Sequence, residues 1–356
     1  MDGCVQCGGP VLLRVSPYTG KGACSLEERG QGMRPFRHLD VESVEEACSV
    51  LRRYGRRARL NAGGTDLLAL LKAEVLPRYP EVIVNIKTIP QMDYITEDDG
   101  RLRIGALARL SDIEASLIIR EKYKLLSEAA HSVATPQIRH IATIGGNLCQ
   151  EVRCFYFRYP YEIGGPILCA RKGKGPCYAI RGDNRYHSIF GGKRCFAVCP
   201  SDMATALCAL EGRVVVAGPQ GEREIPIEEF YHPLGTHMKE EEMVKEVTIP
   251  RLEGAERQVF LKFTLRRPVD FAIVSVAAVI TMEGTLCKGA RICLGGVAPT
   301  PLRAKRAEEL LLDEPLTDTV VHRAAEEALL ETRPLKKNGY KIEIAKALLK
   351  RALSVI

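Results

Sequence analysis

The sequence is poor in several residue types and patterns that define common protein classes. It contains no tryptophan, and aromatic residues make up only 6% of its 356 positions. No apolar run approaches the roughly 18–20 residues that a membrane-spanning helix requires, since the longest, Phe271 to Ile280, has the length of a buried strand. Its N-terminus has no apolar signal core, so export is not expected. The seven histidines are scattered, and neither a nucleophile–base arrangement nor a His/Glu metal cluster is evident.

Cysteine and positive charge are abundant. The chain has 13 cysteines without an export signal, which favours a reducing compartment, and we expect a cytoplasmic protein. Its length suggests two or three domains, and 46% hydrophobic with 27% charged residues is typical of a soluble globular protein. The net charge is +7, but no nucleic-acid-binding module is recognised. Basic pairs such as Lys336-Lys337 could steer an acidic electron carrier, although solvated helix ends explain them more simply.

Periodicity predicts an α+β protein. A β-α-β-α-β order at the beginning indicates a small, largely parallel layer, in which the capping box Ser43-x-x-Glu46 opens the first helix. A polar boundary near 250–257 precedes three strands and a helical tail. The predicted strands are 33–39, 58–61, 82–86, 101–107, 214–217, 246–249, 259–265, 272–280 and 290–295. The predicted helices are 43–54, 67–72, 111–118, 121–131, 201–210, 304–312, 320–331 and 342–353.

Two glycine turns could together hold one pyrophosphate. The first, Ala62-Gly63-Gly64-Thr65-Asp66, connects a predicted strand to a helix, where backbone amides can bind an anion. Neither G-x-G-x-x-G nor a Walker pattern is present, and most Gly-Gly pairs only make tight turns. The second turn, Thr143-Ile144-Gly145-Gly146-Asn147, follows about 80 residues later. Asp202, in Pro-Ser-Asp-Met-Ala, adds an acidic acceptor suited to a ribose or ribityl hydroxyl.

These motifs, with Arg266-Arg267-Pro-Val-Asp270-Phe-Ala-Ile-Val and Gly295-Gly-Val-Ala-Pro-Thr-Pro-Leu-Arg303, resemble the FAD-binding subunits of the molybdenum hydroxylases. That family includes xanthine dehydrogenase and carbon monoxide dehydrogenase. The resemblance implies a two-part FAD-binding domain of the vanillyl-alcohol-oxidase (PCMH) type over 33–250. It also implies a C-terminal antiparallel sheet with helices over 257–356, of the CO dehydrogenase flavoprotein type.

The same resemblance implies FAD contacts at definite positions. A flavin-side hydroxyl is expected at Asp202, and Lys262 occupies the place of a lysine near the isoalloxazine ring. Turn geometry or surface charge is the alternative role for each residue. The residues expected to hold the pyrophosphate are Leu60, Asn61, Ala62, Gly63, Gly64, Thr65, Asp66, Thr143, Ile144, Gly145, Gly146 and Asn147.

The segment from 149 to 199 separates Gly-Gly-Asn from Pro-Ser-Asp by more than 50 residues, which is uncommon for a loop without structure of its own. It resembles the insertion in the flavin subunit of 4-hydroxybenzoyl-CoA reductase, which binds an extra 4Fe-4S cluster. That likeness implies the ligands Cys154, Cys169, Cys177 and Cys195, spaced C-x14-C-x7-C-x17-C. Cys199 is the rival of Cys195. Structural zinc usually takes paired C-x2–4-C knuckles, which are missing here, and inert packing thiols remain an alternative.

Residues 1–32 form an irregular extension with Cys4-x-x-Cys7, which could be half of a metal knuckle. A purine-rich codon run for Glu27-Glu28-Arg29-Gly30 would resemble a ribosome-binding site, so translation is hypothesised to begin at Met33.

The resemblance implies an oxidoreductase subunit that carries FAD and one 4Fe-4S cluster and leaves substrate chemistry to a partner subunit. It would relay electrons between an external carrier, ferredoxin or NAD, and a hetero-oligomer with a small 2Fe-2S subunit and a large molybdopterin subunit. An aryl-CoA reductase is one such complex. The alternative is an NAD-reducing xanthine, aldehyde or CO dehydrogenase subunit whose cysteine loop binds zinc or no metal. A flavin-less scaffold is the non-enzymatic possibility.

Overall fold

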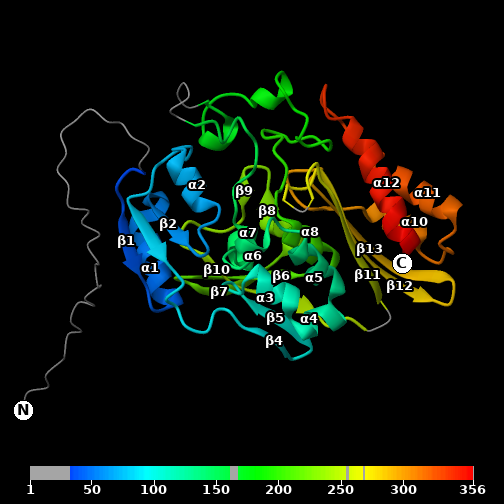
Figure 1. Ribbon diagram of the computed structural model, residues 1–356, viewed down its shortest axis with the longest axis horizontal. Coiled ribbons are helices and arrows are strands. Elements are labelled where there is room, and N and C mark those ends of the chain that lie inside the picture. Colours follow the sequence, from blue (N-terminus) through cyan, green and yellow to red (C-terminus); the bar gives the residue numbers. More distant parts are fainter. Residues whose placement is uncertain (1–32, 161–166, 254–255, 268, 356) are drawn as a thin grey trace, which may run out of the picture.

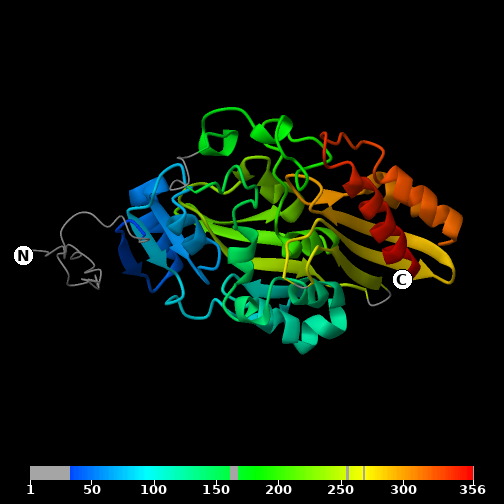
Figure 2. The same cartoon turned by 45° about the horizontal axis from the view of Figure 1, so that its top comes forward.

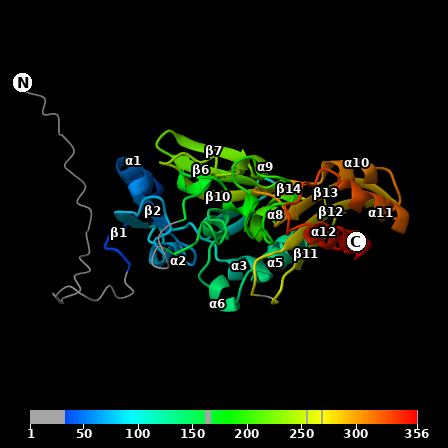
Figure 3. The ribbon, with the colours of Figure 1, turned by 90° about the horizontal axis from the view of Figure 1, so that it is seen from above.

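The computed structural model describes residues 33–160, 167–253, 256–267 and 269–355. The Cys4-x-x-Cys7 motif and the hypothesis of a start at Met33 therefore concern residues outside the described chain. Along the long axis lie, in order, a small N-terminal lobe, a larger central lobe and a C-terminal domain (Figure 1). The view from above shows the same order (Figure 3).

The N-terminal lobe is the predicted parallel layer. Its strands pair in the order β1-β3-β2, all parallel. The predicted helix cap is confirmed, because the Ser43 hydroxyl accepts from the Glu46 amide at the start of α1. Ala47, Val50 and Leu51 form the buried face of that helix. The elements are β1 (Arg37–Asp40), α1 (Val44–Tyr54), β2 (Ala58–Asn61), α2 (Leu67–Lys72) and β3 (Val82–Asn85).

The central lobe is built on a five-stranded antiparallel sheet in the order β4-β5-β10-β6-β7. Its two edge strands, β4 and β7, were not predicted. Both are polar because an edge strand pairs on one side only and exposes most of its residues. The strands are β4 (Ile95–Asp98), β5 (Arg101–Gly105), β6 (Arg213–Gly218), β7 (Gly221–Pro226) and β10 (Met243–Pro250), with the small pair β8 (Tyr231–His232) and β9 (Gly235–Thr236).

Helices of the central lobe differ from the prediction in several places, and the short helices at Pro136–Arg139 and Ile227–Phe230 were not predicted at all. Three helices replace the two expected over 111–131, because the backbone is extended at Ser116 and leaves the helical region at Tyr123. The expected turn at Thr143–Asn147 is instead the beginning of a short helix, capped by Thr143. The helices are α3 (Leu110–Ala115), α4 (Leu117–Lys122), α5 (Lys124–His131), α6 (Pro136–Arg139), α7 (Ile144–Leu148), α8 (Asp202–Ala209) and α9 (Ile227–Phe230).

The C-terminal domain is an antiparallel sheet, β11-β12-β13-β14, against which three helices pack (Figure 2). Its own apolar core lies between sheet and helices. The strands are β11 (Glu256–Phe263), β12 (Val274–Glu283), β13 (Leu286–Gly295) and β14 (Leu302–Arg303), and the helices are α10 (Lys305–Leu311), α11 (Asp318–Glu327) and α12 (Tyr340–Val355). Helices α5 and α8 pack against this sheet and join it to the central lobe. The predicted α+β fold is confirmed.

The segment 149–199, called here the cysteine segment, forms the upper edge of the molecule in Figure 1. Within its described residues, regular structure is limited to two 3-10 turns, Ala170–Lys172 and Tyr178–Ile180. A small apolar core lies beneath it and includes Phe157, Cys169 and Cys195, with Leu70 and Val75 from the N-terminal lobe.

Candidate functional site

A cavity of about 440 Å³ lies where the two glycine segments meet. Twelve of the fourteen residues expected to contact FAD line it, although they come from four separate parts of the chain. Ile144 and Gly145 are the two that do not. The lining residues are Leu60, Asn61, Ala62, Gly63, Gly64, Thr65, Asp66, Thr143, Gly146, Asn147, Asp202 and Lys262.

The first glycine segment is shaped by close contact with the second. A Cβ on Gly63 would lie 2.1 Å from the Ile141 carbonyl oxygen, so only glycine fits there. Gly64 has a φ of +70°, a conformation that glycine adopts without strain. Within the described chain, the amides of Gly63, Gly64 and Thr65 donate no hydrogen bond to protein. These three N–H groups at the cavity wall are therefore available to an anionic ligand.

The second glycine segment differs from the expectation. The amides of Ile144 and Gly145 donate to the carbonyls of Ala108 and Ala106, each at 3.0 Å. Both residues are buried, and the Gly145 backbone lies against Ala106. Their amides cannot also donate to a phosphate. These two residues hold α7 in place, and any contact they make with a pyrophosphate would not use their N–H groups.

Ser201, which directly precedes Asp202, links the two motifs that contain Asn147 and Asp202. The Ser201 hydroxyl donates to Asn147 Oδ1 at 2.6 Å and accepts from the Ala204 amide, capping α8. With its oxygen bound, Asn147 keeps its NH₂ group for a ligand. Asp202 is the first residue of α8, where the helix dipole favours a negative charge.

Lys262 reaches from β11 of the C-terminal domain to this cavity. Its ammonium lies 2.7 Å from the Asp202 carboxylate and donates to the Ser132 carbonyl at 2.8 Å. The Lys262 and Asp202 side chains are only 8% and 6% exposed. Burial raises the pKa of Asp202, and the ammonium opposes that shift. The two residues, 60 positions apart, form one buried ion pair.

Asp66 lines the cavity but is occupied by protein partners. Its carboxylate accepts from the Glu151 amide at 2.8 Å and from the guanidinium groups of Arg158 at 2.6 Å and Arg153 at 2.9 Å. All three donors belong to the cysteine segment. Asp66 therefore ties the first glycine segment to the beginning of the cysteine segment.

Arg153 was missed by the sequence analysis. It lies over the Phe271 ring at 4.2 Å and lines both the main cavity and a contiguous apolar one of about 290 Å³. Burial lowers its pKa to about 10, which leaves it charged at neutral pH. Its Nε is buried without a partner among the described residues. No motif marks Arg153, because it lies directly before Cys154 in a segment whose only recognisable pattern is its cysteines.

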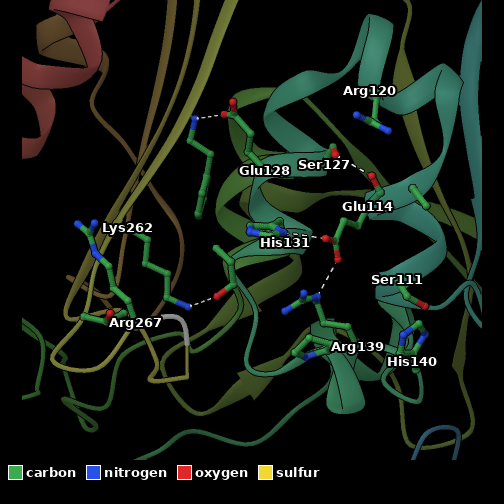
Figure 4. Close-up of a pocket in the computed structure, with 15 residues that line it drawn as sticks. Ser111, Glu114, Arg120, Ser127, Glu128, His131, Arg139, His140, Lys262 and Arg267 are labelled. Atoms are coloured by element: carbon green, nitrogen blue, oxygen red, sulfur yellow. Dashed lines mark hydrogen bonds and ion pairs between the residues drawn. The ribbon is translucent and has the colours of Figure 1, made fainter.

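A larger open cleft of about 960 Å³ adjoins this site (Figure 4). It lies between helices α3, α5 and α6 and strand β11, and Lys262 lines both it and the main cavity. On its floor, Glu114 binds His131 and Arg139, each at 2.7 Å. Arg120 and Arg267 face the cleft and form no ion pair within the described residues. The sequence analysis did not anticipate this cleft.

The four cysteines predicted as metal ligands line one small cavity, although the segment joining them is irregular. Cys154, Cys169, Cys177 and Cys195 come together there, while Cys199 does not line it. Burial raises the pKa of Cys154 to about 11, so its thiol is protonated in the absence of a metal. His187 Nε2 lies 3.3 Å from Cys154 Sγ.

This arrangement fits the donor set of a 4Fe-4S cluster, which takes four thiolates. The cavity is about 20 Å³, room for little more than one water, so side chains must rotate outward to admit a cluster. No group of three or more His, Cys, Asp or Glu converges on a single-ion position within the described residues. All ten cysteines of the described chain are free thiols.

Two protein families match the chain in succession. The family described as "FAD binding domain in molybdopterin dehydrogenase" matches residues 34–252. The family described as "CO dehydrogenase flavoprotein C-terminal domain" matches residues 260–356.

Similar proteins extend over nearly the whole chain. The aldehyde oxidoreductase FAD-binding subunit PaoB of Escherichia coli K12 is 34% identical, over 90% of this chain and 98% of that protein. The carbon monoxide dehydrogenase medium chain of Hydrogenophaga pseudoflava is 28% identical, over 90% and 96%. A solved structure of carbon monoxide dehydrogenase from Hydrogenophaga pseudoflava superposes with a TM-score of 0.72 at 27% identity, covering 90% of this chain and 97% of that one. No helix among the described residues is long and apolar enough to cross a membrane.

Proposed function

Because the chain belongs to the FAD-binding subunits of the molybdopterin dehydrogenases, we propose that it is the electron-transfer flavoprotein of such a complex and carries FAD and one 4Fe-4S cluster. The observation that carries this proposal is the cavity in which two glycine segments, Asp202 and Lys262 meet beside the four-thiol cavity. Bound flavin supplies the one- and two-electron redox chemistry. The residues of this chain hold and orient it.

In this proposal the free amides of Gly63, Gly64 and Thr65 bind the pyrophosphate, with the Asn147 side chain opposite them. The Arg153 guanidinium supplies the positive charge that a buried diphosphate requires. Asp202 accepts from a hydroxyl on the flavin side, and Lys262 holds that carboxylate in its ionised form. The contiguous apolar cavity beside Phe271 suits a flat aromatic ring.

The cluster is assigned to Cys154, Cys169, Cys177 and Cys195. Their common cavity supports Cys195 over Cys199, which is buried elsewhere against the flavin side of the segment. Cys154 lines both the four-thiol cavity and the apolar cavity that continues into the main one. It therefore provides a route through the protein between the two centres.

We further propose a cytoplasmic hetero-oligomer with a small 2Fe-2S subunit and a large molybdopterin subunit. The free thiols support a reducing compartment. The names of two similar proteins, aldehyde oxidoreductase and carbon monoxide dehydrogenase, support a direction of electron flow from a substrate that is being oxidised to this subunit. Reduction of an aryl-CoA, in which electrons flow from the carrier to the substrate, is an alternative reaction for the same complex. The resemblance of the cysteine segment to the insertion in 4-hydroxybenzoyl-CoA reductase supports this alternative.

A second candidate is an NAD-reducing subunit whose cysteine segment binds zinc or no metal. The cleft of Figure 4 favours it, because Arg120 and Arg267 could hold the phosphates of a nucleotide next to Lys262.

Cofactor analysis of the complex, purified without oxygen, tests the proposal. Per FAD in this subunit we expect about four iron atoms and four sulfides beyond those of the partner subunits. The subunit expressed alone provides the sharper measurement, since partner clusters are then absent. A subunit that contains FAD but no extra iron would contradict the proposed cluster and favour the second candidate. A colourless protein would contradict both candidates.

A further inference from the structure

Nearly all of the chain's net positive charge belongs to the cysteine segment. Residues 149–199 contain nine Lys and Arg against three Asp and Glu, so they contribute +6 of the net +7. The other 305 residues are therefore almost neutral as a set. The net charge of the whole chain thus comes from a strong local concentration of positive charge in one segment.

Part of this charge is compensated by ion pairs. Arg153 and Arg158 bind Asp66 in the interior, and the exposed Arg185 binds Asp183 at 2.7 Å. The exposed remainder forms no ion pair within the described residues. It consists of Lys174, Arg181, Lys193 and Arg194.

Two lysines of the C-terminal domain extend this surface. The Lys337 amide donates to Asn184 Oδ1 at 2.9 Å, which places the exposed pair Lys336 and Lys337 against the cysteine segment. We call the six cations, Lys174, Arg181, Lys193, Arg194, Lys336 and Lys337, the basic face. They come from two domains, which the Lys337–Asn184 hydrogen bond brings together beside the cysteine segment, and that segment forms the upper edge in Figure 1.

Exposed apolar side chains occur in the same segment as four of these cations. Leu168, Tyr178 and Ile180 are 45–50% exposed, and they flank the predicted ligands Cys169 and Cys177 along the chain. Tyr178 and Arg194 themselves line the four-thiol cavity, so an apolar and a basic side chain meet at the proposed cluster. A transient protein interface typically has an apolar centre with a charged rim, and this segment supplies both kinds of side chain.

We infer that the basic face is the docking surface for an acidic one-electron carrier protein of the ferredoxin class. Charge complementarity steers such a partner and orients it, and the apolar centre then brings its cluster close to the four-thiol site. This inference rests on the proposed cluster. A nucleotide acceptor would instead use the cleft of Figure 4, on another part of the molecule.

The electron count fixes the stoichiometry. Each two-electron oxidation of substrate at the partner subunit reduces two carrier molecules, one electron to each. No bond is made or broken at the basic face, and the protons of the reaction are released where the substrate is oxidised.

The experiment uses the complete complex, with an acidic [2Fe-2S] ferredoxin, which accepts one electron per molecule, as the probe. In Lys174→Glu/Arg181→Glu we expect kcat/KM for ferredoxin reduction at low salt to fall at least tenfold, with a flatter dependence on ionic strength. The rate with a neutral quinone should not change, because that acceptor is not steered. Lys336→Glu/Lys337→Glu should reproduce the loss from the other domain.

Arg52→Glu/Arg53→Glu is the matched control, since it reverses two exposed arginines on α1 and changes the net charge equally. Equal losses in this control and in the first variant would overturn the inference. So would a wild-type complex that contains the extra iron yet reduces only NAD or quinone, which leaves the proposed cofactors standing. Absence of the extra iron rejects the cluster and the docking surface together.

Discussion

The two candidate cofactor sites of this protein are held in opposite ways. The FAD cavity is built on the ends of strands and helices, and backbone packs against backbone at Gly63, where an added Cβ would lie 2.1 Å from the Ile141 carbonyl oxygen. The cysteine segment has almost no regular structure among its described residues. Side chains of Asp66 and Asn338 anchor it at its beginning and near its end, together with a few backbone hydrogen bonds such as that from Ile189 to Val297.

This difference explains what each site tolerates. A cavity formed by backbone fails when a single atom is added, because backbone cannot move aside cheaply. A segment held by side-chain hydrogen bonds and thiols fails when a ligand or an anchor is removed. The two sites also differ in charge, since the cysteine segment holds most of the positive charge of the chain.

The contrast is tested most strongly by removing one thiol. In Cys154→Ser we expect the extra iron of the subunit to be lost almost completely while FAD remains, because most residues assigned to FAD lie outside the cysteine segment. Iron and flavin analysis of the isolated subunit measures both. Cys199→Ala is the control and should keep its iron. Iron retained in Cys195→Ala but lost in the control would assign the fourth ligand to Cys199.

The reverse experiment adds one methyl group. Gly63→Ala should lower the FAD content more than tenfold, because the new Cβ collides with the Ile141 carbonyl and separates the two glycine segments. Iron should remain. Gly339→Ala, where no heavy atom lies within 4 Å of the added Cβ, should retain its flavin. Full FAD content in Gly63→Ala would mean that the two segments need not touch.

The buried ion pair across the domain junction gives the next largest effect. Lys262→Met leaves Asp202 buried without its partner, and we expect the free energy of unfolding to fall by about 3–5 kcal/mol. Chemical denaturation with FAD removed measures it. Lys288→Met, at an exposed ion pair with Asp313, should change the stability by less than about 1 kcal/mol. Equal effects would show that Lys262 is effectively solvated.

The smallest effect concerns the anchor of the cysteine segment at Lys341. Burial lowers its pKa from 10.5 to about 7. Between these values the unfolded chain binds more protons than the folded one, so stability should rise with pH by up to about 1.4 kcal/mol per unit. Urea unfolding at pH 7, 8 and 9 measures this slope, which Lys341→Met should abolish. An unchanged slope in that variant would assign the pH dependence to other groups.

The fold was predictable wherever apolar periodicity was strong. The parallel layer, α8 and the C-terminal sheet and helices all follow from buried faces that recur at the period of a helix or strand. Edge strands β4 and β7 were missed because they bury few residues. The helix break at Ser116 depends on packing of α4 and α5, which local sequence does not reveal.

In the candidate site, too, sequence patterns identified some residues, whereas the role of others depends on packing. The glycine segments and Asp202 were identified by motif, and the structure gathers them around one cavity. Motifs do not show where a backbone N–H is already used, and the amides of Ile144 and Gly145 in fact donate to protein carbonyls. Arg153 was missed because its role comes from burial against Phe271, a residue 118 positions away.

The contact between the C-terminal domain and the cysteine segment also implies an order of folding. Asn338 donates to the carbonyls of His187 and Ser188, and the Lys341 ammonium donates to the His187 carbonyl at 3.1 Å. Both donors belong to a domain whose apolar core is separate from that of the cysteine segment. We therefore expect the cysteine segment to take its final shape only after the C-terminal domain has folded against it.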